Sequence, residues 1–225
     1  MMDGLFPTEA ATRAPARGRL AALRASPLAH GLILGGFALA TALILSLSDT
    51  FTRDPIAARA TEDLLASLDQ VLPPELYTND PAATLREIDD PVEGVLPVHI
   101  GAKAGQVTGV ALELTGYGYG GAIRVLIGID PNGEILGARV LAHAETPGLG
   151  DKIEAAKSFW IENFTGKSLS NTADESWKVS KDGGTFDQFS GATITPRAVV
   201  ATVHRGLTLF ARNRDALLAP METTP

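Results

Sequence analysis

The sequence predicts an α+β protein, in which a single N-terminal transmembrane helix precedes a domain with a twisted antiparallel sheet packed by helices. Three features support this fold class: an uncharged apolar run of 20 residues over 28–47, strand-like runs separated by glycine turns from about Gly94, and a long apolar-periodic helix near the C-terminus. At 225 residues, the chain can hold one medium-sized domain and an accessory segment.

Composition excludes several kinds of chemistry. The chain contains no cysteine, which removes disulfides, iron–sulfur clusters, c-type haem attachment and thiol nucleophiles. The four histidines show no metal-ligand spacing, so we predict no metal site. The net charge of −7 makes nucleic acid a poor partner. Any redox role must therefore use an organic cofactor.

The apolar run lies within a predicted transmembrane helix over residues 25–48. As a helix, the run of 20 apolar residues rises about 30 Å, which matches the hydrocarbon core of a bilayer. A cleavable signal peptide would have a shorter apolar region followed by a small-residue cleavage site, which residues 47–51 do not provide. We therefore expect a retained anchor in the lipid bilayer.

The distribution of positive charge predicts the orientation of this helix. Residues 1–24 form a basic tail with four arginines, whereas the charged residues just after the span are mostly acidic. Positive charge is retained on the cytoplasmic side, so the tail should be cytoplasmic and the main domain periplasmic in a Gram-negative cell. We expect a single-pass protein of the cell inner membrane.

The rest of the chain divides into three predicted parts. Residues 49–92 form a helical connecting segment, residues 93–218 the main domain, and residues 219–225 a C-terminal tail. In the connecting segment, Asp54-Pro55 opens an amphipathic helix and Pro73-Pro74 ends it. Within the domain we expect strands at 95–100, 106–114, 122–130 and 135–141, a helix at 152–164, a short strand at 177–180, and a closing helix from Pro196 to about Leu218.

A polar loop of small residues precedes the closing helix. It reads Asp187-Gln-Phe-Ser-Gly-Ala-Thr193, and Thr195-Pro196 is typical of a helix start. A helix N-terminus offers unpaired N–H groups and partial positive charge, so a phosphate attached to Thr193 or resting near it would be well placed. Taken alone, the same residues also fit a loop that only caps the helix.

A second loop, His143 to Lys152, follows a predicted strand and precedes a predicted helix. Its glycines, its backbone N–H groups and Thr146 can approach a ligand ring or phosphate. The alternative is a plain strand-to-helix connection with Asp151 as the cap. We interpret His143 as a surface or hydrogen-bonded histidine and not as a catalyst.

Two further motifs resemble nucleotide-binding loops but lack the required context. Gly116, Gly118 and Gly121 satisfy G-x-G-x-x-G, yet they lead into a strand pattern where a dinucleotide fold needs a helix. This loop instead brings Tyr117 and Tyr119 near a planar ligand or a partner, or it is an ordinary interstrand loop. Residues 165–168 resemble the end of a P-loop, but position 161 is isoleucine where glycine is required.

The span, the glycine loop, Glu145-Thr-Pro-Gly-Leu-Gly-Asp-Lys152 and Asp187-Gln-Phe-Ser-Gly-Ala-Thr193, in this order, resemble one known family. It is the G subunit of Rnf-type ion-translocating electron transport complexes and, more distantly, the C subunit of the sodium-translocating NADH:quinone reductase. The resemblance covers about residues 25–215 and implies a periplasmic FMN-binding domain.

The resemblance implies that FMN is covalently joined through its phosphate to a threonine hydroxyl by a flavin transferase using FAD. Thr193 is the implied acceptor, with Thr195 as the nearby rival. The family's attachment pattern matches Asp187, Ser190, Gly191, Ala192 and Thr193. Its flavin-contacting segment matches Glu145, Thr146, Gly148, Leu149 and Gly150, for which only a binding role is implied.

The implied function is electron relay inside a membrane complex that couples ferredoxin and NAD(H) chemistry to ion transport. The chain would act as a redox subunit with no catalytic residue and no activity of its own. Its partners would be the other membrane subunits, including a second flavinylated one, and the flavin transferase. The alternatives are the same flavin domain in a sodium-translocating quinone reductase, or a membrane-tethered scaffold or ligand-binding domain without redox activity.

Overall fold

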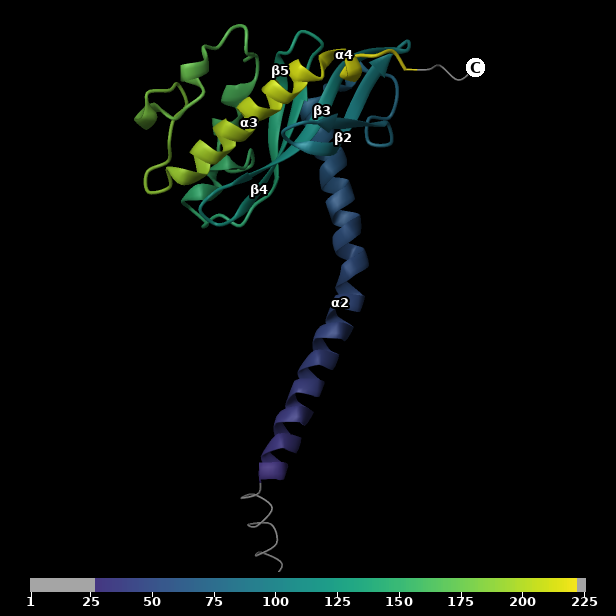
Figure 1. The fold of residues 1–225 in the computed structure, drawn as a ribbon, viewed down its shortest axis with the longest axis vertical. Helices are drawn as coiled ribbons and strands as arrows, with labels where there is room; N and C mark the ends of the chain where they lie inside the picture. The colour runs from purple at the N-terminus through teal and green to yellow at the C-terminus, as the bar shows by residue number, and fades with distance from the viewer. Residues whose placement is uncertain (1–26, 222–225) are drawn as a thin grey trace, which may run out of the picture. The chain divides into compact units, whose positions relative to one another are not determined.

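The computed structural model describes residues 27–221, so the predicted basic tail over 1–24 and the last residues of the predicted C-terminal tail lie outside it. The chain separates into two compact units, Met1–Ala58 and Arg59–Pro225. The first unit contains most of a long helix, and the second contains the end of that helix, a sheet and the remaining helices (Figure 1).

The long helix, α2, runs over Pro27–Val71. Its first half is apolar, with exposed leucine, isoleucine and phenylalanine side chains, and by length and composition it is the one candidate membrane span among the described residues. The prediction of a separate helix beginning at Asp54-Pro55 is wrong, because α2 continues through Pro55. A proline inside a helix removes one backbone hydrogen bond, and a long helix can absorb that loss.

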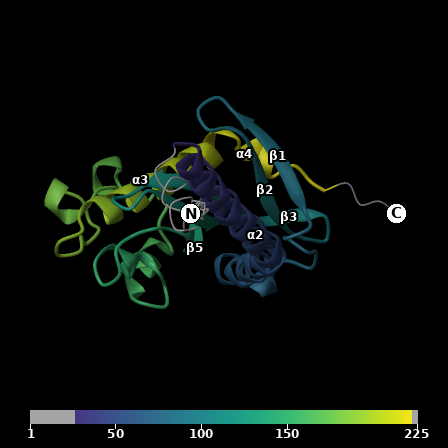
Figure 2. The same ribbon diagram turned by 90° about the horizontal axis from the view of Figure 1, so that it is seen from below.

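The second unit is built on a five-stranded antiparallel sheet, which confirms the predicted fold class. The strands follow one another in chain order across the sheet, and Figure 2 shows the first three side by side. Short connections between antiparallel neighbours account for this meander. The strands are β1 (Leu85–Asp90), β2 (Gly94–Lys103), β3 (Gln106–Tyr117), β4 (Ala122–Ile129) and β5 (Ile135–Ala142).

Strand β1 corrects the prediction that residues 49–92 form a helical connecting segment. It is an edge strand that pairs only with β2, and of its residues only Ile88 and Asp90 are buried. Charged residues occupy most of its other positions, so the alternation of apolar and polar residues that signals a strand is absent. A short 3-10 turn, η1 (Pro74–Leu76), follows α2 after the two prolines.

The sheet is covered on both faces. Helix α3 (Ile194–Arg212) packs against β3 and β4 through buried residues that include Val199, Val203 and Phe210, as its apolar stripe predicts. The end of α2 buries Leu68 and Val71, and the next residue Leu72, against sheet residues in a second cluster. These two layers hold the strands rigidly, and the connecting loops emerge at the sheet ends.

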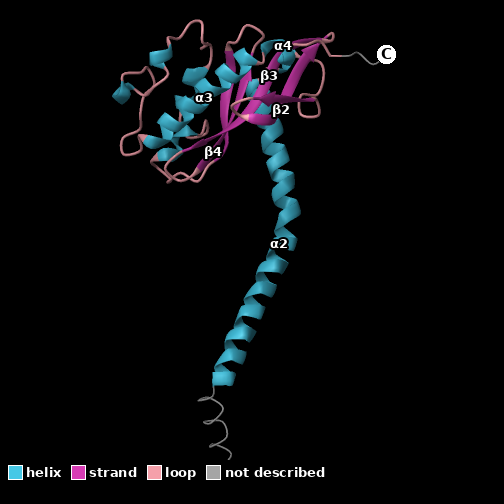
Figure 3. Ribbon diagram, in the orientation of Figure 1, coloured by secondary structure: helices cyan, strands magenta, loops and turns pink. Residues whose placement is uncertain are grey.

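Three predicted boundaries in the second half of the domain differ from the structure (Figure 3). The expected helix at 152–164 is two 3-10 turns, η2 (Gly150–Ile153) and η3 (Phe159–Phe164), because the chain turns between them and Ser158 caps the second. The expected strand at 177–180 is one bridge between Val179 and Phe186, flanked by short turns. These turns are η4 (Asp174–Ser176) and η5 (Ser180–Asp182).

The closing helix also begins and ends earlier than predicted. It starts at Ile194 and not at Pro196, and it breaks at Asn213 before a short helix α4 (Arg214–Leu217). The Asn213 side chain donates to the Leu209 carbonyl at 3.0 Å and to the Asp90 carboxylate at 2.7 Å. These two bonds fix the turn that ends α3 against strand β1.

Candidate functional site

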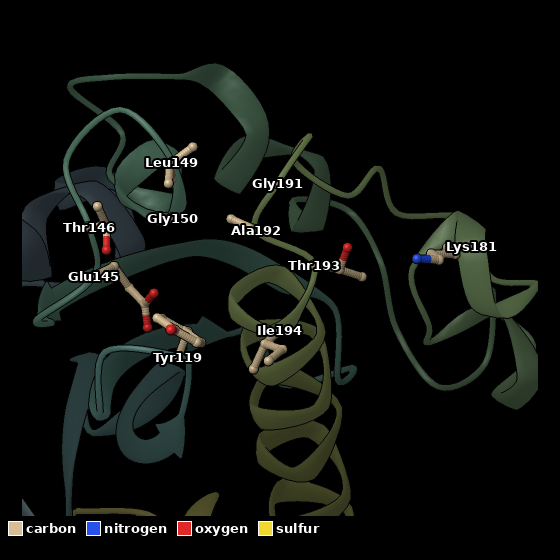
Figure 4. Close-up of a pocket in the computed structure, with 10 residues that line it drawn as sticks. All are labelled: Tyr119, Glu145, Thr146, Leu149, Gly150, Lys181, Gly191, Ala192, Thr193 and Ile194. Carbon is tan, nitrogen blue, oxygen red and sulfur yellow. The ribbon is translucent and has the colours of Figure 1, made fainter.

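A cavity of about 550 Å³ lies where four connecting segments meet (Figure 4). Ligand pockets of this size commonly hold small cofactors. The segments are the glycine loop between β3 and β4, the loop after β5, the η5 turn, and the residues that enter α3. The lining residues are Tyr119, Glu145, Thr146, Leu149, Gly150, Lys181, Gly191, Ala192, Thr193 and Ile194.

The cavity brings together both loops that the sequence singled out, although they are far apart along the chain. The predicted site residues that line it are Glu145, Thr146, Leu149, Gly150, Gly191, Ala192 and Thr193. Three others do not line it: Gly148, whose positive φ of 80° shapes the loop, Ser190, which is exposed, and Asp187. The Asp187 carbonyl accepts a hydrogen bond of 2.8 Å from the Trp160 indole and so anchors the Thr193 loop.

Glu145 is the buried acid of the cavity and joins three of its segments. One carboxylate oxygen accepts from the Gly120 N–H at 3.0 Å, and the other accepts from the Thr195 hydroxyl at 2.7 Å. Hydrogen bonds to a charged acceptor are stronger than neutral ones. Glu145 therefore ties the glycine loop and the first turn of α3 to its own loop.

The glycines around Glu145 are needed for close approach. A Cβ on Gly150 would lie 2.6 Å from a Glu145 carboxylate oxygen, and a Cβ on Gly118 would overlap the other oxygen. This packing explains the glycine loop without any dinucleotide. The loop carries Tyr119 to the cavity, whereas Tyr117 is exposed and does not line it.

Two hydroxyls near the start of α3 have different surroundings. Thr195 is buried and its hydroxyl is used by Glu145. Thr193 is half-buried at the N-cap position, where its backbone is already helical and its side chain makes no capping hydrogen bond. Among the described residues, the Thr193 hydroxyl has no hydrogen-bond partner and borders the cavity. A loop that only caps the helix would use that hydroxyl as the cap.

The loop after β5 is held by a chain of polar contacts behind the cavity. His143 Nδ1 accepts from the Glu145 N–H at 3.0 Å, which leaves Nε2 to donate to Glu154 at 2.7 Å. Lys157 contacts both Glu154 and Asp151, and its hydrogen bonds are the main cause that lowers the pKa of each carboxyl group. The interpretation of His143 as a hydrogen-bonded residue is confirmed, and Asp151 forms an ion pair where a helix cap was the alternative.

Lys181 and Ile194 line the cavity but were not predicted as site residues. Lys181 lies on the η5 turn, and Asp182 in the same turn forms a two-pronged ion pair with Arg197 of α3, at 2.7 and 3.0 Å. No local sequence pattern indicated what this turn would face. Only the fold brings this turn to the start of α3.

The cavity residues fit a flavin mononucleotide. Leu149, Ile194 and Tyr119 expose large apolar or aromatic surfaces to the cavity, as a planar ring requires. Near them lie the free Thr193 hydroxyl, the Lys181 ammonium group and the N-terminus of a 19-residue helix, which suit a phosphate. No charged group other than Glu145 and Lys181 lines the cavity within the described residues.

Comparisons with known proteins match two parts of the chain to family models. An FMN-binding domain model matches residues 118–208, which include every residue lining the cavity. An RnfG N-terminal region model matches residues 25–71.

Curated relatives match nearly the whole chain. The G subunit of the ion-translocating oxidoreductase complex of Cereibacter sphaeroides is 60% identical over 207 residues, covering 92% of this chain and 94% of that protein. The corresponding G subunit of Pseudomonas aeruginosa is 46% identical over 211 residues, covering 90% and 97%. A solved structure of the C subunit of the Na⁺-translocating NADH-quinone reductase from Parabacteroides distasonis is 22% identical, with a TM-score of 0.47 over 70% of this chain and 94% of that one.

The identity to the two G subunits decides between the two flavoprotein complexes that the sequence resembled. It extends through the membrane segment and the domain, and both family models agree with it. The chain therefore belongs to the G subunits of Rnf-type ion-translocating oxidoreductase complexes and contains an FMN-binding domain.

Proposed function

We propose that this protein is a single-pass inner-membrane electron carrier that holds FMN covalently on Thr193. It relays electrons within an Rnf-type complex that couples ferredoxin and NAD(H) chemistry to ion transport. The observation that carries the proposal is the free Thr193 hydroxyl at the edge of a flavin-sized cavity. The rival hydroxyl of Thr195 is buried and donates to Glu145, so its modification would break the contact that organises the cavity.

Attachment from FAD transfers the FMN phosphoryl group to the Thr193 hydroxyl. The Thr193 oxygen forms a new bond to the phosphorus atom of the FMN half, the pyrophosphate P–O bond breaks, AMP leaves and the hydroxyl proton is released. A flavin transferase catalyses this exchange. The product is a phosphodiester, which keeps the cofactor on a periplasmic domain where a dissociated flavin would be lost.

The residues of the chain bind and orient the cofactor. When bound, FMN supplies reversible electron transfer, and the protein supplies position and environment. Leu149, Ile194 and Tyr119 shield the ring faces from water, and Thr146 adds a hydroxyl beside the backbone N–H groups of its loop. Glu145 keeps the loops that form the cavity at a fixed separation.

The membrane topology and the partners follow from other parts of the chain. The apolar half of α2 supports a membrane anchor, and the arginines before it favour a cytoplasmic N-terminus and a periplasmic domain. The relatives are named as subunits of a complex, which supports association with further membrane subunits. We include among these a second flavinylated subunit.

The test is fluorescence of the denatured protein in a gel under ultraviolet light, after production in a host that contains the transferase. Thr193→Val removes the hydroxyl but keeps the shape of the side chain. We therefore expect the fluorescent band to be lost while the variant still folds. Thr165→Val is the matched control, because Thr165 carries an exposed hydroxyl outside both the cavity and the attachment pattern. A wild-type protein without a fluorescent band, or a Thr193→Val protein with one, would refute the proposal.

A further inference from the structure

We propose that the Lys181 ammonium group binds the phosphate of the flavin and makes the cavity selective for a phosphorylated flavin. This inference rests on the proposed function, in which FMN occupies the cavity with its phosphate at Thr193. It assigns a residue outside both loops that the sequence indicated.

The two charged side chains that line the cavity, Glu145 and Lys181, differ in their partners. Both oxygens of the Glu145 carboxylate are already used by Gly120 and Thr195, and the group is buried. Among the described residues, the Lys181 ammonium group forms no hydrogen bond or ion pair, because the neighbouring Asp182 is held by Arg197. Its charge interacts with Asp182 without a hydrogen bond. Lys181 is therefore a cation without an ion-pair partner that lines a cavity, and it can bind an anion there.

The lysine is directed toward the expected position of that anion. Both residues line the cavity, and Figure 4 shows the amino group of Lys181 on the side of its turn that faces Thr193. The start of α3 alone is a limited phosphate site, because Pro196 in the first turn has no N–H to donate. A phosphate joined to Thr193 would lie between the helix N-terminus and Lys181.

The turn that carries Lys181 is fixed in place, which makes the placement of its side chain specific. The Asp182 to Arg197 ion pair joins this turn to α3, and the Lys181 N–H donates to the Gln188 side chain at 3.1 Å. Gly183 ends the turn with a left-handed φ of 86°. The turn is thereby tied to the same helix that begins at Thr193.

The expected effect is modest because Lys181 is solvent-exposed. An exposed ion pair changes a binding constant by about two- to fivefold, and salt weakens it. The inference therefore predicts a small, salt-sensitive preference for FMN over riboflavin, which has the same ring and sugar chain but no phosphate. Covalent attachment is not needed to observe this preference.

The full-length chain, produced without the transferase and purified in detergent, is titrated with FMN and with riboflavin while flavin fluorescence is followed. We expect the unchanged protein to prefer FMN. Lys181→Met should lower the ratio of FMN to riboflavin affinity by about two- to fivefold at low salt, with riboflavin affinity unchanged. Lys181→Arg should retain the preference for FMN, and high salt should reduce this preference in the wild-type protein.

Lys178→Met is the matched control. Lys178 is exposed in the same region and carries the same charge, but it does not line the cavity. The inference would be overturned if the wild-type protein bound FMN and riboflavin with equal affinity. It would also be overturned if Lys181→Met left the ratio of FMN to riboflavin affinity unchanged, or if Lys178→Met lowered that ratio equally. Failure of covalent attachment in the transferase host is a separate result, which would refute the proposed function and not the phosphate preference.

Discussion

Replacing Glu145 with alanine tests the contact that holds the cavity together. The substitution removes a buried carboxylate that accepts from the Gly120 N–H and the Thr195 hydroxyl, and leaves both donors without that partner. A hydrogen bond to a charged group contributes about 1.5–3 kcal/mol. The carboxylate also loses hydration when it is buried, which offsets part of the gain from two such bonds. We therefore expect a net loss of about 2–3 kcal/mol in the free energy of unfolding.

The change in unfolding temperature can be read from intrinsic fluorescence. The chain contains 2 tryptophans, and both, Trp160 and Trp177, are buried in the domain. For a domain of this size, each kcal/mol lowers the midpoint by about 2–4 °C, so Glu145→Ala should lower it by about 4–12 °C. Glu145→Gln keeps one acceptor oxygen and should cost less.

Glu175→Ala serves as the control for the loss of a carboxylate, because Glu175 is exposed and makes no hydrogen bond or ion pair among the described residues. We expect its midpoint to match that of the unchanged protein. A Glu145→Ala protein that unfolds at the unchanged temperature would refute the view that this residue organises the cavity.

Two further predictions concern acid stability and topology. The hydrogen bond from the Arg212 guanidinium is the main cause that holds the pKa of buried Asp90 well below its ordinary value of 3.8. The ionised Asp90 carboxylate therefore stabilises the fold above pH 3.8, and this stabilisation is lost as the pH falls below that value. Asp90→Asn should flatten the acid-induced loss of stability measured by urea unfolding below about pH 4, and an unchanged slope would contradict this reasoning. Because the chain has no cysteine, single-cysteine variants can report its orientation. A membrane-impermeant maleimide applied to cells with a permeabilised outer membrane should label Glu175→Cys and spare Ala11→Cys, and the reverse pattern would contradict the topology.

The sequence predicted the parts of the fold that leave a local apolar pattern. The strand-like apolar runs between glycine turns and the apolar stripe of α3 are such patterns, and the structure confirms them. Strand β1 was missed because its charged residues hide the alternation, and the helix predicted at 152–164 was wrong because its apolar residues are buried by two 3-10 turns. Local patterns do not record such tertiary packing.

The same limit applies to the candidate site. The two loops were recognisable because their small residues and hydroxyls form short local motifs. The bond between Glu145 and Thr195 joins residues 50 positions apart, and no local pattern could indicate it. Lys181 likewise acquires its place through contacts of the folded chain, which include the ion pair between Asp182 and Arg197. The resemblance of these motifs to one family therefore predicted which loops bind the cofactor, and the contacts between the loops required the fold.

Mass spectrometry of the peptide that contains Thr193 locates the flavin to a single residue. The protein is produced with the transferase, digested and fragmented, so that the residue carrying any flavin can be assigned. We expect a peptide heavier by the mass of FMN less one water, with the flavin on the Thr193 oxygen. An unmodified peptide, or a flavin located on Ser190 or Thr195, would contradict it.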